Sequence, residues 1–347
     1  MTELGMIYRL LRAAFDGGVP EMEEGKCTSQ QWWQLFCLLQ RNHVAAVTAE
    51  AVTRLPKEAR PPREVLVPWL AECEKVRKWS QYQREVEREI IRVMGRHGVD
   101  TLVLKGSHVA TYYPQPLLRE YGDLDLYFYH RHAQADRIAS QELGARVRTD
   151  AHHHSKYDYR GVTVESHYDF VNRHTPWSNR RYEAMLKRLA PTATFEVLFL
   201  LRHMAGHFAS SRITLRDLCD WYLTWRKKAG EIDLAEVERA VAQFQMRTFV
   251  TALGILVERH FGYRIPIVRY ALEDVVVERV ERDIVYGSAG SQEHPVENLG
   301  RLTWKWRRYR ANQWKYKLVY PSISGLAILV SSLVSHTAKP QSILHKM

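Results

Sequence analysis

Residues 99–129, VDTLVLKGSHVATYYPQPLLREYGDLDLYFY, constrain the fold of this chain more than any other stretch. The apolar run at 99–104 is typical of a short buried strand. It ends in Lys-Gly-Ser at 105–107, which predicts a tight turn with accessible backbone amides. Residues 123–128, DLDLYF, then alternate charge with apolar bulk, the period of a strand with one buried face. These two strands are expected to form the centre of the fold.

Two aspartates on the second of these strands indicate a metal site. Asp123 and Asp125 are two residues apart, so their side chains point to the same side of a strand. Neighbouring carboxylates repel each other, and a fold keeps them together mainly where a cation lies between them. Magnesium suits this pair, because it binds few carboxylates and completes its coordination with water and phosphate oxygens.

A predicted hairpin supplies a third acidic candidate. Residues 156–160 and 162–168 alternate around Gly161, as two antiparallel strands would. Glu165 shares one side of the second strand with His167. It is either the solvent side of a half-buried strand or the third carboxylate of the metal site, and the upstream aspartates favour the second interpretation.

Helical patterns flank this core on both sides. Apolar residues recur at helical spacing through 1–95, which we expect to be an N-terminal helical region. The core is expected at 96–178, followed by a helical domain at 179–285. A basic aromatic tail at 286–347 completes the chain.

Two histidine groups have alternative interpretations. Adjacent residues on an extended chain point in opposite directions, so the three histidines at 152–154 are not expected to reach one ion, and a solvated or substrate-facing loop is favoured. His203 and His207 share one face of a predicted helix. The glutamate of the zinc motif His-Glu-x-x-His is missing between them, which favours a buried, hydrogen-bonded pair.

The composition favours an anionic partner. The chain of 347 residues is 46% hydrophobic and carries a net charge of +11, which suits a nucleotide, a nucleic acid or an acidic membrane face. No nucleic-acid module is recognisable. The four cysteines are scattered and form no C-x-x-C pair, and the N-terminus lacks the pattern of a secretory signal, so we expect a cytoplasmic protein.

Part of the positive charge lies in the tail. The Trp/Arg/Lys-rich run at 304–317 precedes an apolar stretch at 318–334 that Pro, Ser and Gly interrupt. Its longest uninterrupted part is far shorter than the roughly 20 apolar residues that span a bilayer. Peripheral membrane contact through 304–335 is one interpretation. Packing on the body of the protein is the favoured one.

The order of these motifs resembles that of a bacterial group known as the uncharacterised nucleotidyltransferase family, within the nucleotidyltransferase superfamily. The resemblance extends over roughly residues 80–225. The matching segments are Leu104-Lys105-Gly106, Tyr113-Pro114, Arg119, Gly122-Asp123-Leu124-Asp125-Leu126, Glu165-Ser166-His167, His203 with His207, and Arg216-Asp217-Leu218.

The resemblance implies an α+β fold, with a small mixed β-sheet nucleotidyltransferase core flanked by N-terminal helices and a C-terminal helical domain. It implies transfer of a nucleoside monophosphate from a nucleoside triphosphate, such as ATP, to an acceptor hydroxyl, with release of pyrophosphate. The acceptor would be a small molecule, a sugar or a protein. A catalytically silent nucleotide-binding or scaffold protein, able to associate with a membrane through its tail, is the alternative.

The resemblance also assigns roles to residues. Two Mg²⁺ ions would be held by the catalytic carboxylates, and His167 would support these ligands from beside them. The catalytic and metal-binding residues would be Asp123, Asp125 and Glu165, and the nucleotide-binding residues would be Lys105, Gly106, Ser107 and Arg119. Glu165 would also accept the proton of the acceptor hydroxyl. The alternatives are that Lys105 is a surface residue and that Arg119 pairs with Glu120 or Asp123.

Overall fold

The computed structural model describes residues 2–21, 27–149, 153–171, 178–267, 269–287 and 301–323, with the side chains of the last range from residue 307 onward. Its helices and strands follow the predicted order. In chain order they are α1 (Glu3–Asp16), α2 (Ser29–Arg41), α3 (Ala45–Arg54), η1 (Lys57–Ala59), α4 (Arg63–Arg96), β1 (Leu102–Val103), α5 (Ser107–Ala110), η2 (Pro116–Leu118), β2 (Asp123–Tyr127), α6 (His132–Glu142), β3 (His154–Tyr159), β4 (Val162–His167), α7 (Ser178–Leu189), α8 (Ala193–Ser210), α9 (Leu215–Lys228), α10 (Leu234–Gln243), α11 (Arg247–Phe261), α12 (Asp274–Tyr286) and α13 (Arg301–Val319).

The sheet has four strands in the order β1-β2-β4-β3. β1 pairs with β2 and β3 pairs with β4 in the antiparallel sense, whereas β2 and β4 are parallel. The sheet is therefore mixed, and the predicted α+β class is confirmed. β1 is shorter than the apolar run at 99–104 predicted, because only Leu102 and Val103 pair with β2.

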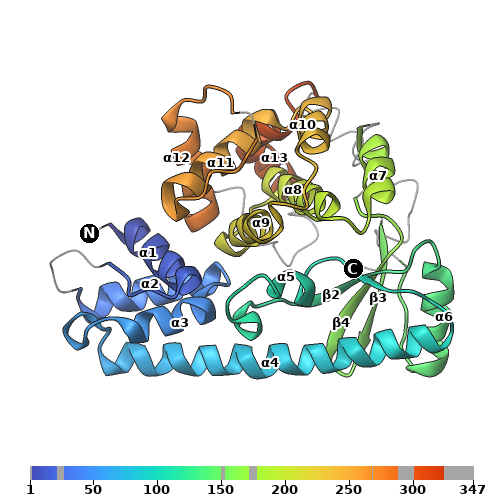
Figure 1. Ribbon diagram of the computed structural model, residues 1–347, viewed down its shortest axis with the longest axis horizontal. Coiled ribbons are helices and arrows are strands. Elements are labelled where there is room, and N and C mark those ends of the chain that lie inside the picture. Colours follow the sequence, from blue (N-terminus) through green and yellow to red (C-terminus); the bar gives the residue numbers. More distant parts are fainter. Residues whose placement is uncertain are drawn as a thin grey trace.

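The two faces of the sheet differ in chemistry because the side chains alternate along each strand. One face is apolar and packs against α4 and α6 in a core cluster of its own. Figure 1 shows α4 running along this side of the sheet, with α6 near its C-terminal end. From the sheet this cluster takes Leu124, Leu126, Tyr157, Val162 and Val164. The opposite face carries the charged residues and the histidines of β2, β3 and β4.

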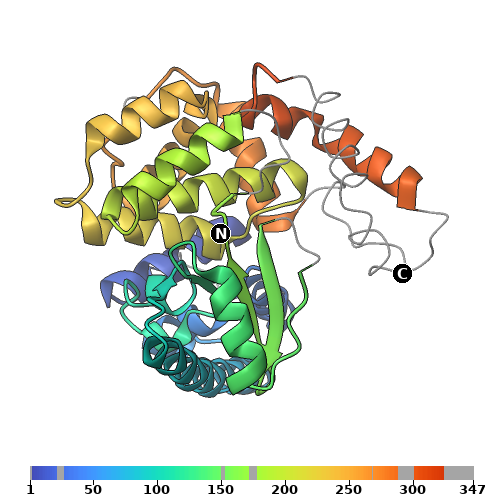
Figure 2. The same cartoon turned by 90° about the vertical axis from the view of Figure 1, so that its right-hand side faces the viewer.

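A larger core cluster joins the N-terminal helices to the C-terminal ones. It contains Leu10 of α1, Trp69 of α4 and Leu218 of α9, all of which are fully or almost fully buried. Figures 1 and 2 show the C-terminal helices grouped on the side of the sheet away from α4. The polar sheet face thus looks toward this second helical group.

The last described helix, α13, packs on the body of the protein against α8 and α11. Its Trp314 ring meets the ring of Phe208 edge to face, at 5.5 Å between centroids. Lys315 is fully buried beside Asp283, at 2.7 Å. Among the described residues, no helix is both long enough and apolar enough to cross a bilayer. The apolar stretch beyond residue 323 lies outside the described residues.

Candidate active site

The strand register arranges the polar face of the sheet in rows. Because β2, β4 and β3 are paired without a slip, residues on the three strands stand side by side. From one end of the face to the other, the rows are Asp123–Thr163–Asp158, Asp125–Glu165–Lys156 and Tyr127–His167–His154. The carboxylates therefore gather toward one end and the imidazoles toward the other, with Glu165 between them.

Asp125 is the most deeply buried of the three carboxylates, with 2% of the residue exposed. Its Oδ1 lies 3.3 Å from Nζ of Lys105 and 3.1 Å from Nε2 of His167. Burial alone would raise the pKa of Asp125, but the nearby Lys105 and His167 outweigh it and hold the pKa well below its usual range. Its Oδ2 is buried and has no hydrogen-bond partner among the described residues.

Glu165 lies beside Asp125 and is half-buried. Burial raises the pKa of Glu165, and repulsion from Asp125 and Asp123 raises it further. Both aspartates therefore act on this carboxylate, as three acidic groups sharing one site would. The predicted trio lies together on one face of the sheet.

The Lys-Gly-Ser turn lies beside this group. Gly106 has φ 59° and ψ −116°, a conformation that only glycine adopts without strain. A Cβ at this position would lie 3.7 Å from the carbonyl oxygen of Asp123. Burial lowers the pKa of Lys105, but attraction to Asp125, Asp123 and Glu165 outweighs it, so the pKa is raised. The Lys105 ammonium is thus a cation among the carboxylates and not a surface group.

The Ser107 hydroxyl has a partner that the sequence did not suggest. It donates a hydrogen bond to Oε2 of Glu87, on α4, at 2.5 Å. Burial raises the pKa of the Glu87 carboxyl. Glu87 belongs to the predicted long amphipathic helix, but only the fold brings that helix to the turn.

Arg119 lies in a buried network away from the polar row. It is 3% exposed, and Nε and Nη2 form a two-point ion pair with Asp220 at 2.9 and 2.5 Å. The hydroxyl of Tyr113 donates to the same carboxylate at 2.7 Å. The observed partner is therefore on α9, and neither Glu120 nor Asp123 is the residue that pairs with Arg119.

The two histidines of α8 cover the lysine of the turn. The rings of His203 and His207 lie 4.4 Å apart between centroids, and Nε2 of His203 is 3.5 Å from Nζ of Lys105. His203 is half-buried and His207 is exposed, so the expected buried pair is only partly buried. Burial lowers the pKa of His203, and the positive charge of Lys105 adds to the effect.

A further pair of histidines joins the site at the start of β3. The chain bends at His153, before the strand begins at His154, so the premise of an extended chain does not apply there. The two rings lie 4.5 Å apart, and 5.4 and 5.2 Å respectively from the ring of His167. His152 lies outside the described residues. Burial, with repulsion from His167, lowers the pKa of His153 to about 2 and that of His154 to about 4.

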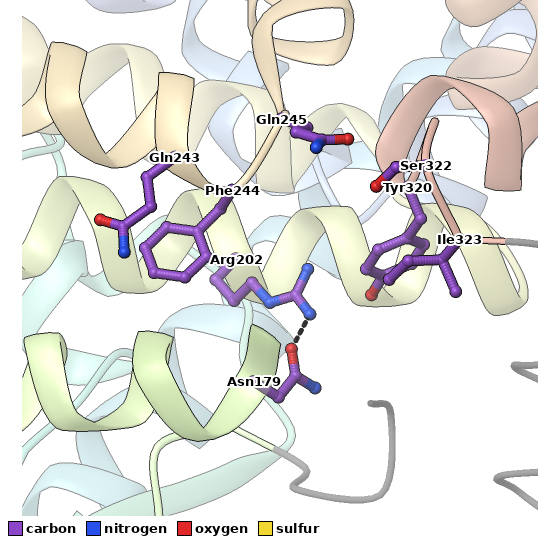
Figure 3. A pocket seen from close by; sticks show the side chains of 8 residues that line it. All are labelled: Asn179, Arg202, Gln243, Phe244, Gln245, Tyr320, Ser322 and Ile323. Carbon is purple, nitrogen blue, oxygen red and sulfur yellow. Dashed lines mark hydrogen bonds between the residues drawn. The ribbon is translucent and has the colours of Figure 1, made fainter. Parts of the chain in front are cut away.

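A cavity elsewhere in the molecule is too small for a nucleotide. It has a volume of about 70 Å³ and lies between α7, α8 and the segment after α13. Figure 3 shows Arg202 reaching across it to Asn179, with Tyr320 on the far side. Sites for small molecules usually enclose about 300–1,000 Å³. A second cavity, of about 410 Å³, lies between α1, α2 and α12, and Glu3 is the acidic residue in its lining. The polar face of the sheet is the candidate active site because the predicted carboxylates gather there.

One comparison with known proteins gives a match. A family model described as uncharacterised nucleotidyltransferase matches residues 28–262, more than half of the chain. This range contains the whole sheet, the turn at 105–107 and helices α8 and α9. No curated protein and no solved structure shows a significant match.

Proposed function

This chain belongs to the uncharacterised nucleotidyltransferase family, and we propose that it transfers a nucleoside monophosphate from a nucleoside triphosphate to an acceptor hydroxyl, with release of pyrophosphate. The observation that carries the proposal is the cluster of Asp123, Asp125 and Glu165 on one sheet face, beside the turn at 105–107. We propose a small molecule, a sugar or a protein as the acceptor.

The donor set fits divalent metal ions. Oδ2 of Asp125 is buried without a partner among the described residues, and Asp125 and Glu165 belong to a group whose ligand atoms lie within 4.8 Å of one another. Carboxylate oxygens are the ligands that Mg²⁺ prefers. Asp123, Asp125 and Glu165 would hold two ions. When bound, these ions would neutralise charge on the attacking and the leaving oxygens.

The remaining groups act on the triphosphate and on the acceptor. Lys105 would neutralise phosphate charge, and Gly106 lets the chain turn without a side chain in the way. Ser107 would contact a phosphate oxygen from a position fixed by Glu87. Glu165 would take the proton of the acceptor hydroxyl on a carboxylate oxygen that is not bound to an ion.

Arg119 takes a different part in the proposal. Its guanidinium is bound to Asp220, so it would act through position and not by direct contact with phosphate. The ion pair fixes the segment between the turn and β2 against α9. Because this segment joins the turn at 105–107 to β2, the ion pair would hold Asp123 in position relative to the turn.

The test is incubation with labelled nucleoside triphosphates and Mg²⁺, with pyrophosphate release measured for the wild type and Asp125→Asn. We expect the variant to lose about 10²–10³-fold or more of the rate, the scale of losing one electrostatic contact to a transition state. Asp158→Asn is the matched control, because Asp158 is exposed at the edge of the same face. Equal pyrophosphate release by the wild type and Asp125→Asn would overturn the assignment.

A silent nucleotide-binding protein is the second candidate. One observation favours it: the ammonium of Lys105 already balances part of the charge of the three carboxylates. In that case nucleoside triphosphate would bind and no pyrophosphate would appear, and binding would weaken in Lys105→Met. The same incubation, combined with a binding titration, distinguishes the two candidates.

A further inference from the structure

At the imidazole end of the polar face, two nitrogens lie near Glu165 at more than good hydrogen-bond distance, and one of them, Nε2 of His167, is also 3.1 Å from Oδ1 of Asp125. Nε2 of His154 lies 3.4 Å from Oε1 of Glu165, and Nε2 of His167 lies 3.7 Å from Oε2 of the same carboxylate. Good hydrogen bonds from nitrogen to oxygen measure about 2.7–3.2 Å. Two ligand atoms on one tetrahedral ion, each bound at about 2.0–2.1 Å, lie about 3.4 Å apart. The spacing between His154 and Oε1 is close to that value, and the spacing between His167 and Oε2 of the same carboxylate is longer, at 3.7 Å.

A third imidazole completes the group. Ligand atoms of His153, His154 and His167 lie within 4.8 Å of one another, and those of Asp125, Glu165 and His167 do as well. His167 and Glu165 connect the histidines to the carboxylates. A tetrahedral ion would draw the imidazole nitrogens closer together by about 1 Å. The bend before β3 lets His153 turn toward the strand residue that follows it.

The Nδ1 atoms of these imidazoles have two kinds of surroundings, and that of His167 matches the surroundings of a metal ligand. Nδ1 of His167 lies 3.3 Å from the carbonyl oxygen of Asp169, and metal-bound histidines commonly donate their outer N–H to such a carbonyl. The Nδ1 atoms of His153 and His154 are buried without a hydrogen-bond partner among the described residues. Oδ2 of Asp125, a residue 98% buried, is equally without one.

The kind of donor selects the kind of ion. Mg²⁺ takes oxygen ligands almost exclusively, whereas imidazole nitrogens with a carboxylate suit borderline ions such as Zn²⁺. We propose that His153, His154, His167 and Glu165 bind one divalent ion of the zinc class, at the opposite end of the face from Asp123. This inference goes beyond the proposed transfer reaction, since it concerns a second kind of ion and requires no nucleotide.

The first experiment uses the full chain without a polyhistidine tag and Zn²⁺ alone. Titration against a zinc indicator should show one tightly bound equivalent and a rise in melting temperature. Replacing Zn²⁺ with Co²⁺ should give the intense visible absorption of a tetrahedral site. Weak, pink octahedral cobalt, or no binding beyond that of scattered surface histidines, would overturn the proposal without any variant.

The second experiment uses variants. His153→Gln combined with His154→Gln should weaken Zn²⁺ binding by more than about tenfold. Removing a residue that only hydrogen-bonds to a metal ligand already weakens binding by at least about tenfold, and this double variant removes two ligands. His97→Gln is the matched control, because His97 ends α4 outside the cluster. Circular dichroism checks that the double variant is folded. Unchanged zinc affinity in the folded double variant would overturn the proposal.

A third variant separates this inference from the proposed function. Asp123 is outside both ligand groups, so Asp123→Asn should lose nucleotidyl transfer and keep the zinc equivalent. Zinc binding without any transfer by the wild type would defeat the proposed function and leave this site standing. Nucleotidyl transfer by a wild type that binds no equivalent of zinc would overturn the zinc site and leave the proposed function standing.

Discussion

At the scale of single residues, Lys105 is the group on which the site depends most. Its ammonium lies 3.3 Å from Oδ1 of Asp125, is attracted by all three carboxylates, and touches His203 on the other side. A divalent ion and this ammonium compete for the same negative charge. Lys105 therefore stabilises the carboxylate cluster before metal binds and opposes metal binding at the same time.

This competition predicts opposite effects of Lys105→Met on two measurements. Without nucleotide, Mn²⁺ should bind more tightly by about tenfold, the equivalent of 1.4 kcal/mol, because a competing charge is gone. With nucleotide, transfer should slow, because a cation for the triphosphate is missing. Electron paramagnetic resonance of free Mn²⁺ and pyrophosphate release measure the two effects. Weaker Mn²⁺ binding would contradict this role.

The control for this prediction is Lys156→Met. Nζ of Lys156 lies 3.3 Å from Oε1 of Glu165, but its side chain is 37% exposed, compared with 20% for Lys105. Solvent screens an exposed charge more strongly. The change in Mn²⁺ affinity should therefore be smaller than in Lys105→Met.

The sequence predicted part of this site for a simple reason. The period of two along a strand places Asp123 beside Asp125 on one face, whatever the rest of the chain does. The hydrogen bond of Glu87 to Ser107 and the pairing of Asp220 with Arg119 do not follow from the sequence, because both acidic residues come from distant helices that spacing does not relate to the turn. The place of His153 in the site does not follow from the alternation of an extended chain, because the chain bends at this residue.

At the scale of elements, the buried pair of Arg119 and Asp220 ties the segment after η2 to α9. Removing one partner of such a pair leaves the other buried without compensation, which typically costs about 3–5 kcal/mol. We expect this loss of unfolding free energy for Asp220→Asn and for Arg119→Met separately. Unfolding in urea, followed by circular dichroism, measures it.

The matched control is the double variant Arg119→Met with Asp220→Leu, compared with Arg119→Met alone and Asp220→Leu alone. It buries no unpaired charge, so it should lose less stability than the sum of the two corresponding single variants. Additive losses would show that the two side chains do not act as a pair. Transfer activity should fall in each single variant that remains folded, because the position of Asp123 depends on this junction.

The start of α9 predicts a dependence of stability on pH. Burial alone would raise the pKa of Asp217, but Arg216 and hydrogen bonds from Thr214 outweigh it and lower the pKa to about 2, from 3.8. The folded state therefore favours the carboxylate. Its contribution of about 2 kcal/mol is complete above pH 4–5 and is lost as the pH falls toward 2.

Asp217→Asn should remove this part of the pH dependence. At pH 7 the variant should unfold at lower urea concentration than the wild type, and the difference should shrink as the pH falls below about 4. Asp233→Asn is the comparison, because the Asp233 carboxylate also accepts a backbone hydrogen bond at a helix start, as the N-cap residue of α10, whereas Asp217 is the third residue of α9. A difference between wild type and Asp217→Asn that stays constant from pH 7 to pH 2.5 would contradict the argument.

The elements themselves were predicted where local pattern decides them. The hairpin of β3 and β4 and the long helix α4 agree with the alternation and the amphipathic spacing. β1 is shorter than its apolar run, since the length of a strand also depends on how far its partner extends beside it. The parallel pairing of β2 with β4 joins segments about 40 residues apart and follows from no local pattern.

At the scale of the whole molecule, the sheet lies between two groups of helices that cover different faces. α4 and α6 bury its apolar face, and α8 lies over its polar face. The cluster that joins Leu10 of α1 to Leu218 of α9 makes the N-terminal and C-terminal helices one packed body around the site. Core substitutions in either group of helices are therefore expected to change the relative positions of the three carboxylates.

The basic tail helix is part of this body as far as it is described. Lys315 is 0% exposed and lies 2.7 Å from Asp283 of α12, which is 3% exposed. Lys315→Met would leave Asp283 buried and unpaired, so we expect a loss of about 3–5 kcal/mol in unfolding free energy. Lys317→Met, on the exposed side of the same helix, should change it by less than about 0.5 kcal/mol.

Vesicle flotation distinguishes packing from membrane contact for this helix. If α13 packs on the body of the protein and its basic face is simply exposed to solvent, neither the wild type nor Lys317→Met should bind anionic vesicles. Contact with a membrane surface instead predicts binding that weakens in Lys317→Met and in added salt, because each lysine near such a surface adds about 1 kcal/mol. The buried pair of Lys315 with Asp283 favours the first outcome, since one face of the helix is already held by the protein.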